Sequence, residues 1–390
     1  MGMKIEMDLE SRLKEAVAYA VRTGSFHKMN LIGCAKHVCV YGLGRYFKDA
    51  FNKQKVRKRF HVDMLCDSDF EKVKSLTNRP EYEGLRGISV DELKNTENVY
   101  VIVMLGNPTE VLRQIGGAIG MENCAAYNDV ALDDVISKEE KYRKTEYFKG
   151  EQENIIKAFH LLGDEKSRER YVNVICNRIA PQMSTMSYDQ MYQSLQYFPN
   201  DVFKLTEHES VVDGGAYTGD TLSSFLQVSQ NQFDAYHAFE IDSKNFDRLS
   251  QERGKHKPSV QNKIYCYQKG LWDVEGALSY GRQASDDSYS MYNGEDTVAV
   301  ETVSLDGFLG EERITFIKMD IEGAEWKALQ GAKGIIENQK PKMAICVYHR
   351  LEDIWKIPIF LKELVPEYRI AIRHHAKFWV AETVCYAYCG

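Results

Sequence analysis

The sequence has no hydrophobic run close to the ~20 residues that a transmembrane helix needs, so no membrane span is expected. It also lacks an excess of positive charge, because 50 Lys and Arg stand against 57 Asp and Glu, a net charge of −7. Proteins that bind nucleic acids or anionic membranes generally present a basic surface, so neither partner is expected. The first ten residues alternate Met with Lys, Glu and Asp, which does not predict a signal peptide.

The nine cysteines include no C-x-x-C pair, the spacing that is typical of zinc sites and redox motifs. Their number is odd, and five lie in apolar runs that we predict to be strands: Cys39, Cys66, Cys266, Cys346 and Cys385. Free cysteine behaves in such places as a small hydrophobic residue. We therefore expect reduced thiols and a cytoplasmic protein.

A chain of 390 residues corresponds to two or three domains of about 150 residues each. We expect an N-terminal helix in 1–29, a small Rossmann-like α/β domain in 30–136, a charge-rich helical connector in 137–205 and a larger α/β domain in 206–390. In both α/β domains, apolar strands alternate with helix-compatible segments, which is typical of parallel sheets.

The larger domain contains seven candidate strands, which are SVVDGG, DAYHAFEID, KIYCYQKGLW, ITFIKMD, KMAICVYH, YRIAIRHH and TVCYAYC. Because only a short turn region precedes the last one, we predict a doubly wound sheet with a reversed edge strand. The polar segment 280–298 is predicted to form an inserted loop or hairpin between the third and fourth strands. The segment AEWKALQGAKGIIEN is predicted to form a helix.

A glycine-rich loop follows the first of these strands, where residues 213–220 read DGGAYTGD. In such a turn Gly215 would let a ligand approach the backbone, Gly219 would allow close helix packing, and the helix that follows offers unpaired N–H groups. Asp213 would accept a hydrogen bond from an ammonium group. The next strand ends in Phe239-Glu240-Ile241-Asp242, where the acid Glu240 can bind both hydroxyls of a ribose.

Together, the loop and the acid predict a nucleotide site, and the alternative is a glycine turn that only packs. Dinucleotide dehydrogenases begin this loop with G-x-G-x-x-G, whereas here an acid comes first. An acid suits the cationic methionine group of S-adenosylmethionine, which is therefore the favoured cofactor.

Residues 210–390 resemble the FkbM family of S-adenosylmethionine-dependent methyltransferases. The resemblance rests on the segments VVDGGAYTGD, FEID, VSLDGFL, FIKMDIEGAEWKALQGA and AICVYH. It implies the class I methyltransferase fold and methyl transfer, mostly to hydroxyls of sugars, polyketides or lipid-linked glycans. It also implies that the cofactor is bound by Asp213, Gly214, Gly215, Tyr217, Thr218, Gly219, Glu240, Ile241, Gly270, Leu271 and Trp272. Trp272 could stack on the adenine or pack in the core, and Tyr217 stands where the broader class has a glycine.

The segment KMDIEGAE carries the candidate catalytic residues. Lys318 and Asp320 share one face of an apolar strand close to its carboxyl end, where doubly wound sheets bind ligands, and Glu322 follows in the turn. Buried charges need partners or a purpose, so we expect these three residues at the site. His349 ends the next strand and could act as a base or contact the acceptor. Asp320, Glu322 and His349 could also hold a divalent ion, but no strict ligand spacing supports one, and no metal is predicted.

The N-terminal domain carries an incomplete fingerprint, G-x-G-x-x-F, with Gly42, Gly44 and Phe47, and Asp67 ends its second strand. A platform that only packs is therefore favoured there over a nucleotide site. The preferred function is S-adenosylmethionine-dependent O-methylation of a sugar, a glycan or another small molecule. The alternatives are an NAD-dependent or nucleotide-sugar-binding oxidoreductase that acts through the N-terminal domain, and a non-catalytic two-domain binding protein. The sequence is compatible with a homo-oligomer.

Overall fold

The computed structural model describes residues 8–23, 27–136, 139, 141, 145–282, 289–290 and 297–390. The described residues divide into two compact units. Unit 1 draws on Met1–Ile156, Glu169–Tyr192 and Ala376–Val380, and unit 2 on Lys157–Arg168, Gln193–His375 and Ala381–Gly390. Both units therefore include residues from the segment 137–205 that we predicted to be a connector.

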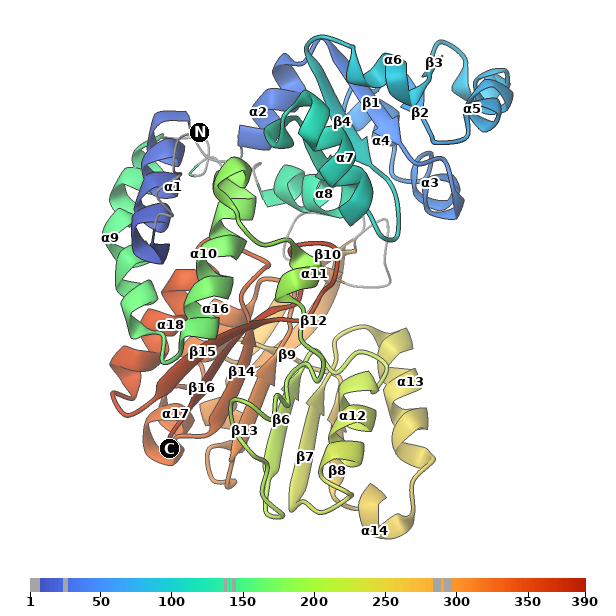
Figure 1. The fold of residues 1–390 in the computed structure, drawn as a ribbon. Coiled ribbons are helices and arrows are strands. Elements are labelled where there is room, and N and C mark those ends of the chain that lie inside the picture. Colours follow the sequence, from blue (N-terminus) through green and yellow to red (C-terminus); the bar gives the residue numbers. More distant parts are fainter. Residues whose placement is uncertain are drawn as a thin grey trace. The chain divides into compact units, whose positions relative to one another are not determined.

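Unit 1 contains a five-stranded sheet in the order β3-β2-β1-β4-β5 (Figure 1), and all of its strand pairs are parallel. Its strands are β1 (His37–Tyr41), β2 (Met64–Cys66), β3 (Arg86–Ile88), β4 (Val99–Val103) and β5 (Cys124–Ala126). Val38 and Val40 of β1 pack into one apolar cluster, whereas Cys39 and Tyr41 pack into another. The sheet is thus covered by apolar side chains on both faces, as parallel sheets are. The three strands predicted here, β1, β2 and β4, are confirmed.

The helices of unit 1 are short, apart from α1 and α7. They are α1 (Leu9–Thr23), α2 (His27–Cys34), α3 (Arg45–Ala50), α4 (Val56–Arg59), α5 (Phe70–Thr77), α6 (Val90–Lys94), α7 (Thr109–Ile119), α8 (Tyr127–Ile136) and α11 (Tyr188–Met191), with the 3-10 helices η1 (Pro80–Tyr82), η2 (Met121–Asn123) and η4 (Pro181–Met183). Two further helices, α9 (Thr145–Leu161) and α10 (Glu165–Ile179), contribute residues to both units.

Unit 2 is built on a seven-stranded sheet in the order β15-β16-β14-β13-β6-β7-β8. Its strands are β6 (Ser210–Gly214), β7 (Ala235–Phe239), β8 (Ile264–Tyr267), β13 (Phe316–Met319), β14 (Lys342–Cys346), β15 (Arg369–His374) and β16 (Thr383–Tyr388). All seven predicted strands are present. The last one is reversed, as predicted, but it was wrongly expected at the edge: β16 lies antiparallel between β14 and β15. Because β16 is hydrogen-bonded to a strand on each side, the edge strand of the sheet is β15.

A second, four-stranded sheet in unit 2 has the order β11-β10-β12-β9. Its strands are β9 (Gly270–Leu271), β10 (Gly276–Arg282), β11 (Tyr289–Ser290) and β12 (Thr297–Val303). The predicted hairpin is therefore present and begins earlier than expected, while residues 283–288 and 291–296 of the predicted insertion lie outside the described residues. The predicted strand KIYCYQKGLW is divided, because Gly270 and Leu271 pair with β12 in this second sheet.

The helices of unit 2 are α12 (Asp220–Val228), α13 (Ser243–Gly254), α14 (Pro258–Gln261), α15 (Leu305–Leu309), α16 (Glu325–Gln330), α17 (Lys333–Gln339) and α18 (Asp353–Leu364). The helix predicted over AEWKALQGAKGIIEN is broken into α16 and α17. At the break, a side chain on Gly331 would come within 2.1 Å of the Trp272 carbonyl oxygen. The carboxylate of Asp306 accepts hydrogen bonds from the N–H groups of Gly334 and Ile335, both at 2.8 Å, and so stabilises the start of α17.

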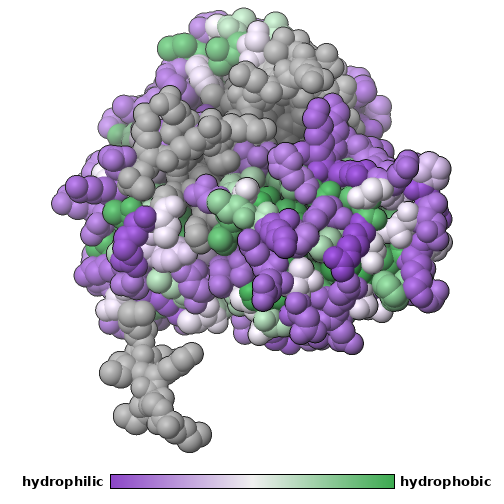
Figure 2. Space-filling view, turned by 90° about the horizontal axis from the view of Figure 1, so that it is seen from above, coloured by the Kyte–Doolittle hydropathy of each residue, from purple (hydrophilic) through white to green (hydrophobic). Residues whose placement is uncertain are grey.

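The face in Figure 2 is mostly hydrophilic where its residues are described, and apolar side chains appear there in small groups. Among the described residues, no helix combines the length and the apolar character that crossing a membrane requires. All nine cysteines are free thiols, and of the five predicted on strands, four are buried and Cys266 is half-buried.

Candidate active site

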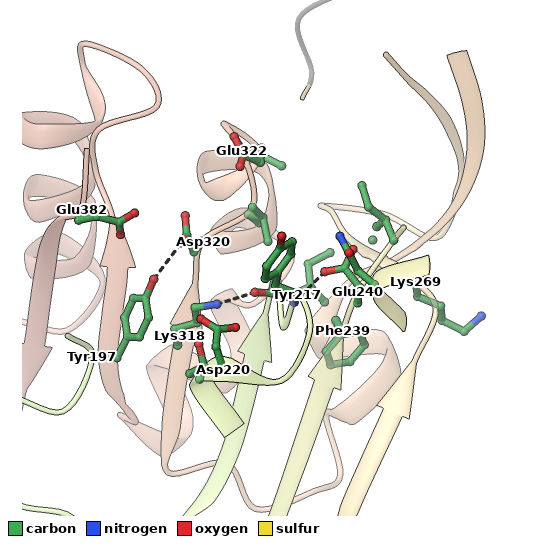
Figure 3. Close-up of a pocket in the computed structure, with 18 residues that line it drawn as sticks. Tyr197, Tyr217, Asp220, Phe239, Glu240, Lys269, Lys318, Asp320, Glu322 and Glu382 are labelled. Carbon is green, nitrogen blue, oxygen red and sulfur yellow. Dashed lines mark hydrogen bonds between the residues drawn. The ribbon is translucent and has the colours of Figure 1, made fainter. Parts of the chain in front are cut away.

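A cavity of about 330 Å³ lies in unit 2 at the carboxyl ends of β6, β7 and β13. Figure 3 shows that side chains from all three strand ends and from the loop before β16 converge on it. Nine of the residues predicted for the site line the cavity, namely Gly215, Tyr217, Glu240, Ile241, Gly270, Leu271, Lys318, Asp320 and Glu322. The fold thus brings these residues together at the edge where parallel sheets bind ligands.

Backbone geometry explains the two loop glycines that were singled out. Gly215 has φ 74°, and a Cβ atom on it would lie 1.9 Å from the Asp320 carbonyl oxygen. Gly219 has φ 91° and precedes α12, where a Cβ atom would meet the Glu252 side chain at 3.0 Å. Both residues thus satisfy a left-handed conformation and close packing within the chain. Gly215 also lines the cavity, and the approach of a ligand to its backbone stays a prediction.

Glu240 holds the glycine loop through its carboxylate. One oxygen accepts a hydrogen bond from the Tyr217 N–H at 2.8 Å, and the other accepts one from the Asp242 N–H at 2.7 Å. Tyr217 itself has φ 48°, so this bond stabilises a conformation that is unusual for a tyrosine. Burial raises the pKa of Glu240 to about 7. Figure 3 shows the carboxylate at the cavity, between the loop and Phe239.

Asp213 does not line the cavity, and its carboxylate is engaged within the chain. One oxygen lies 2.8 Å from the Lys318 Nζ, and the other accepts a hydrogen bond from the Tyr236 hydroxyl at 2.6 Å. Asp213 and Lys318 are both fully buried. The ammonium group that Asp213 meets is therefore that of Lys318, which corrects the prediction that it meets a ligand.

Lys318 fastens the glycine loop to β13. Its Nζ donates to the carbonyl oxygens of Gly214 at 3.1 Å and Gly215 at 2.7 Å, and it lies 5.1 Å from the centre of the Tyr197 ring. Burial alone would lower the pKa of Lys318, but Asp213 and then Asp320 raise it above its ordinary value. The side chain therefore stays cationic, with its charge next to the cavity.

Asp320 accepts hydrogen bonds from two tyrosines. The Tyr197 hydroxyl donates to one oxygen at 2.8 Å, and the Tyr348 hydroxyl donates to the other at 3.0 Å. Burial alone would raise the pKa of Asp320, but His349 and Lys318 outweigh it and lower the pKa below its ordinary value. Asp320 is thus held as a carboxylate.

His349 is buried beside the cavity but does not line it. Its Nδ1 lies 2.8 Å from a Glu325 carboxylate oxygen, and its Nε2 lies 3.5 Å from both Glu322 and Asp320. Burial alone would lower the pKa of His349, but Glu325, Glu322 and Asp320 raise it to about 10. The imidazole is therefore protonated near neutral pH and cannot take up a further proton, which argues against the predicted role as a base.

Four other predicted residues also lie outside the cavity lining, namely Gly214, Thr218, Gly219 and Trp272. Trp272 donates its backbone N–H to the Val303 carbonyl, and the Lys327 Nζ lies 5.9 Å from its ring centre. Stacking on an adenine and packing in the core were both left open for Trp272, and its place outside the cavity lining favours packing.

Half of the residues that line the cavity were not predicted from the sequence. These residues are Tyr197, Asp220, Thr221, Phe239, Asn245, Lys269, Ile321, Ala324 and Glu382. Asp220 could have been found, because it directly follows the glycine loop. Tyr197 and Glu382 carry no local signal, since one lies in an irregular segment and the other in a loop before a strand.

Among the described residues, two groups of side chains place their ligand atoms close enough together to hold a metal ion. Ligand atoms of Asp320, Cys346 and Glu382 lie within 4.8 Å of one another, as do those of Asp320, Glu325 and His349. To bind an ion, His349 in the second group would have to release the proton that its raised pKa retains.

In unit 1, the glycine loop after β1 is held in the same manner as the loop after β6. Gly42 has φ 95°, and the Leu43 N–H donates to an Asp67 carboxylate oxygen at 2.7 Å. The same oxygen accepts a hydrogen bond from the Lys72 Nζ at 2.7 Å. Asp67 is therefore paired with a lysine of its own domain, whereas Glu240 receives only backbone donors among the described residues.

The strand order of unit 2 and the cavity at its strand ends define an α/β protein with a methyltransferase-like fold. Residues 213–376 match the family model described as a methyltransferase FkbM domain. Residues 213–376 thus carry the FkbM methyltransferase domain that the sequence predicted.

The whole chain is similar to the crystal structure of a methyltransferase FkbM from Methylobacillus flagellatus KT, with 19% identity and a TM-score of 0.70 over 98% of this chain and 100% of that one. It is more distantly similar to Aeropyrum pernix fibrillarin with natively bound S-adenosyl-L-methionine, with 12% identity and a TM-score of 0.30 over 48% of this chain and 70% of that one. A putative methyltransferase from Streptococcus mutans in complex with SAH gives 10% identity and a TM-score of 0.30 over 48% and 90%. No curated protein matches the sequence.

Proposed function

We propose that this protein transfers a methyl group from S-adenosylmethionine to a hydroxyl group of a sugar, a glycan or another small molecule. The observation that carries the proposal is Glu240, a carboxylate held by two backbone N–H groups at the wall of the cavity. Such an acid, at the end of the second strand of a nucleotide-binding sheet, is suited to the two hydroxyls of a ribose.

The chemistry of the cavity fits this cofactor. Phe239, Ile241 and Leu271 surround Glu240 with apolar surface that suits an adenine. Asp220 lines the cavity and is suited to the ammonium group of the methionine, the role that we had predicted for Asp213. The three N–H donors of Lys318 are already engaged within the chain, so this residue contributes a positive charge beside the cavity. When bound, S-adenosylmethionine supplies a methyl group that a positively charged sulfur activates.

The remaining wall suits an acceptor rich in hydroxyl groups. Asp320, Glu322 and Glu382 line it together with Tyr197, and carboxylates accept hydrogen bonds from hydroxyls strongly. Orientation of the acceptor oxygen is the main demand of such a reaction and can contribute up to ~7–11 kcal/mol. The Tyr197 and Tyr348 hydroxyls hold Asp320 in place for that task. The free thiols support a location in the cytoplasm.

Calorimetric titration with S-adenosylmethionine, S-adenosylhomocysteine and NAD tests the proposal. We expect the first two ligands to bind and NAD to give no heat. Binding of NAD alone, abolished by Gly42→Ala in unit 1, would favour the oxidoreductase alternative. Binding of none of the three would favour the non-catalytic one. Transfer of tritium from S-adenosyl-[methyl-³H]methionine to a panel of methyl glycosides then tests the acceptor class, against the same panel with the hydroxyls blocked.

A further inference from the structure

Glu382 is a cavity residue that neither the sequence prediction nor the family resemblance singled out. It directly precedes β16, and the insertion of β16 between β14 and β15 brings it opposite Asp320 (Figure 3). Its backbone has φ 63°, a left-handed conformation that is unfavourable for a residue with a side chain. Its carbonyl accepts a hydrogen bond from the His375 N–H at 2.9 Å, and one of its carboxylate oxygens accepts one from the Gln196 side chain. The chain thus holds a strained residue with its acid at the cavity.

Glu382 and Asp320 form a pair of acids, with ligand oxygens within 4.8 Å of each other. Two carboxylates this close are not readily charged together, so their surroundings decide which one keeps a proton. Asp320 receives two tyrosine hydroxyls and lies near the cations of Lys318 and His349. Its pKa is accordingly lowered. Burial, and after it the charge of Asp320, raise the pKa of Glu382 to about 7.

Five other titratable groups that lie around Glu382 do not exchange a proton near neutral pH. They are Lys318, Tyr197, Cys346, Tyr348 and His349. Lys318 and His349 are already protonated, and the pKa values of the two tyrosines and the cysteine are raised well above their ordinary range, first by burial. Glu382, whose pKa is raised to about 7, can therefore both lose and gain a proton near neutral pH.

We propose that Glu382 is the proton acceptor of the reaction and that Asp320, held by its two tyrosines, orients the acceptor hydroxyl. This inference rests on the methyl transfer proposed above. As the bond from the acceptor oxygen to the methyl carbon forms, the bond from that carbon to sulfur breaks and its electron pair stays on sulfur. The hydroxyl proton moves to a carboxylate oxygen of Glu382. The products are a methyl ether, a neutral thioether and a protonated Glu382, so the charge balances.

Proton release on ligand binding tests this role without an acceptor. The positive sulfur of S-adenosylmethionine should favour the carboxylate form of Glu382, so that binding at pH 7 expels part of its proton. S-adenosylhomocysteine has the same ribose, adenine and amino acid groups but no such charge, and Glu240 therefore responds equally to both ligands. Calorimetry in buffers of different ionisation enthalpy, phosphate and Tris, counts the protons.

We expect S-adenosylmethionine to release more protons than S-adenosylhomocysteine, and we expect Glu382→Gln to abolish the difference. Glu382→Asp, which keeps a carboxyl group, should retain part of it if the Gln variant folds poorly. Glu367→Gln is the matched control, because this exposed glutamate pairs with Lys340 and precedes the start of β15, whereas Glu382 lies near the other end of that strand, where His374 pairs with Thr383.

A difference that persists in Glu382→Gln, or that is absent from the wild type, would overturn the role of Glu382 while leaving cofactor binding intact. Absence of binding by both ligands would instead overturn the proposed function and, with it, this inference. With the methyl glycoside that accepts tritium, we expect Glu382→Gln to lower kcat by ~10²–10⁴-fold and to remove the acidic limb of the pH profile near pH 7. A purely structural role would lower the amount of folded enzyme and leave that limb in place.

Discussion

Glu240 holds the glycine loop and, under the proposed function, also binds the ribose of the cofactor. Its two oxygens each accept a backbone N–H, which fixes the loop that contains Tyr217. A carboxylate oxygen has more than one lone pair, so each oxygen can also accept a hydroxyl. The cost of burying this acid is visible in its raised pKa of about 7.

We expect Glu240→Ala to weaken binding of S-adenosylhomocysteine by at least tenfold, because a hydrogen bond to a charged group contributes ~1.5–3 kcal/mol. Calorimetry measures the affinity, and a thermal melt shows whether the variant is folded. Asp247→Ala is the control, since this exposed aspartate lies on α13, directly after the Glu240 segment. An unchanged affinity in a folded Glu240→Ala protein would refute the ribose assignment.

His349 illustrates how neighbours decide the chemistry of a residue. With three carboxylates around it, the imidazole is a buried cation that pairs with Glu325 at 2.8 Å. Removal of one partner of such a pair leaves the other charge buried without compensation. The residue is therefore better described as a structural cation that also holds Asp320 in its charged form.

For His349→Gln we expect a loss of about 3 kcal/mol in the free energy of unfolding, the lower end of the range for breaking a buried ion pair. S-adenosylhomocysteine affinity should change little. Chemical denaturation and calorimetry measure the two effects, with the exposed His208→Gln as control. Wild-type stability combined with a large loss of turnover would restore the role of His349 as a base.

At the scale of elements, the turn from β6 to α12 is determined by contacts within the chain. Gly215 turns the backbone in a left-handed conformation directly against the carbonyl oxygen of Asp320. The cavity exists because β6 and β13 end side by side and their loops touch at this point. A side chain on Gly215 would push the ends of these two strands apart.

We expect Gly215→Ala to destabilise unit 2 by more than ~1–2 kcal/mol, the cost of the left-handed backbone alone, and to abolish cofactor binding. Gly254→Ala is the matched control: it ends α13, and no atom lies within 4 Å of the Cβ position, so it should be neutral or slightly stabilising. Denaturant unfolding compares the variants. Equal stability of the two alanine variants would contradict the packing argument.

At the scale of the whole molecule, titration of buried groups sets the dependence of stability on pH. Burial raises the pKa of Asp129 to about 6, and Glu240 and Glu382 are raised to about 7. For acids whose pKa is raised on folding, the folded state binds more protons, so stability falls as the pH rises through this range. His349, raised to about 10, stabilises the fold below its ordinary pKa, and this stabilisation is lost as the pH rises through about 10.

Lowered pKa values act at the other end of the pH scale. Burial alone would raise the pKa of Asp201, but hydrogen bonds from Lys166 and Gln193 lower it to about 2. The contribution of this carboxylate to the stability of the fold is therefore lost as the pH falls towards 2. We expect Tm to be highest near pH 5 and to fall towards pH 9, as measured by differential scanning calorimetry without ligand. In Glu382→Gln the fall between about pH 5 and 7 should be smaller. A Tm that rises from pH 5 to 8 would contradict these assignments.

Much of the architecture follows from local sequence patterns. The seven strands of the large sheet, the glycine loop and Glu240 were all predicted, because apolar runs of strand length and a loop at fixed spacing are local signals. Strands β3 and β5 of unit 1 were not predicted, since their segments RGI and CAA consist mainly of small or polar residues and not of large apolar ones. The break at Gly331 was missed for another reason: it depends on the carbonyl of Trp272, which is distant in sequence.

The sequence by itself determined which segments form the sheet and which residues stand at its strand ends, because strand period, glycine turns and polar interruptions are properties of neighbouring residues. The tertiary structure alone decided how those residues are used. It paired Lys318 with Asp213, surrounded His349 with three carboxylates and placed Glu382 opposite Asp320 by inserting β16 inside the sheet. Charge states and cavity walls depend on atoms that meet across distant segments, and no local pattern records those meetings.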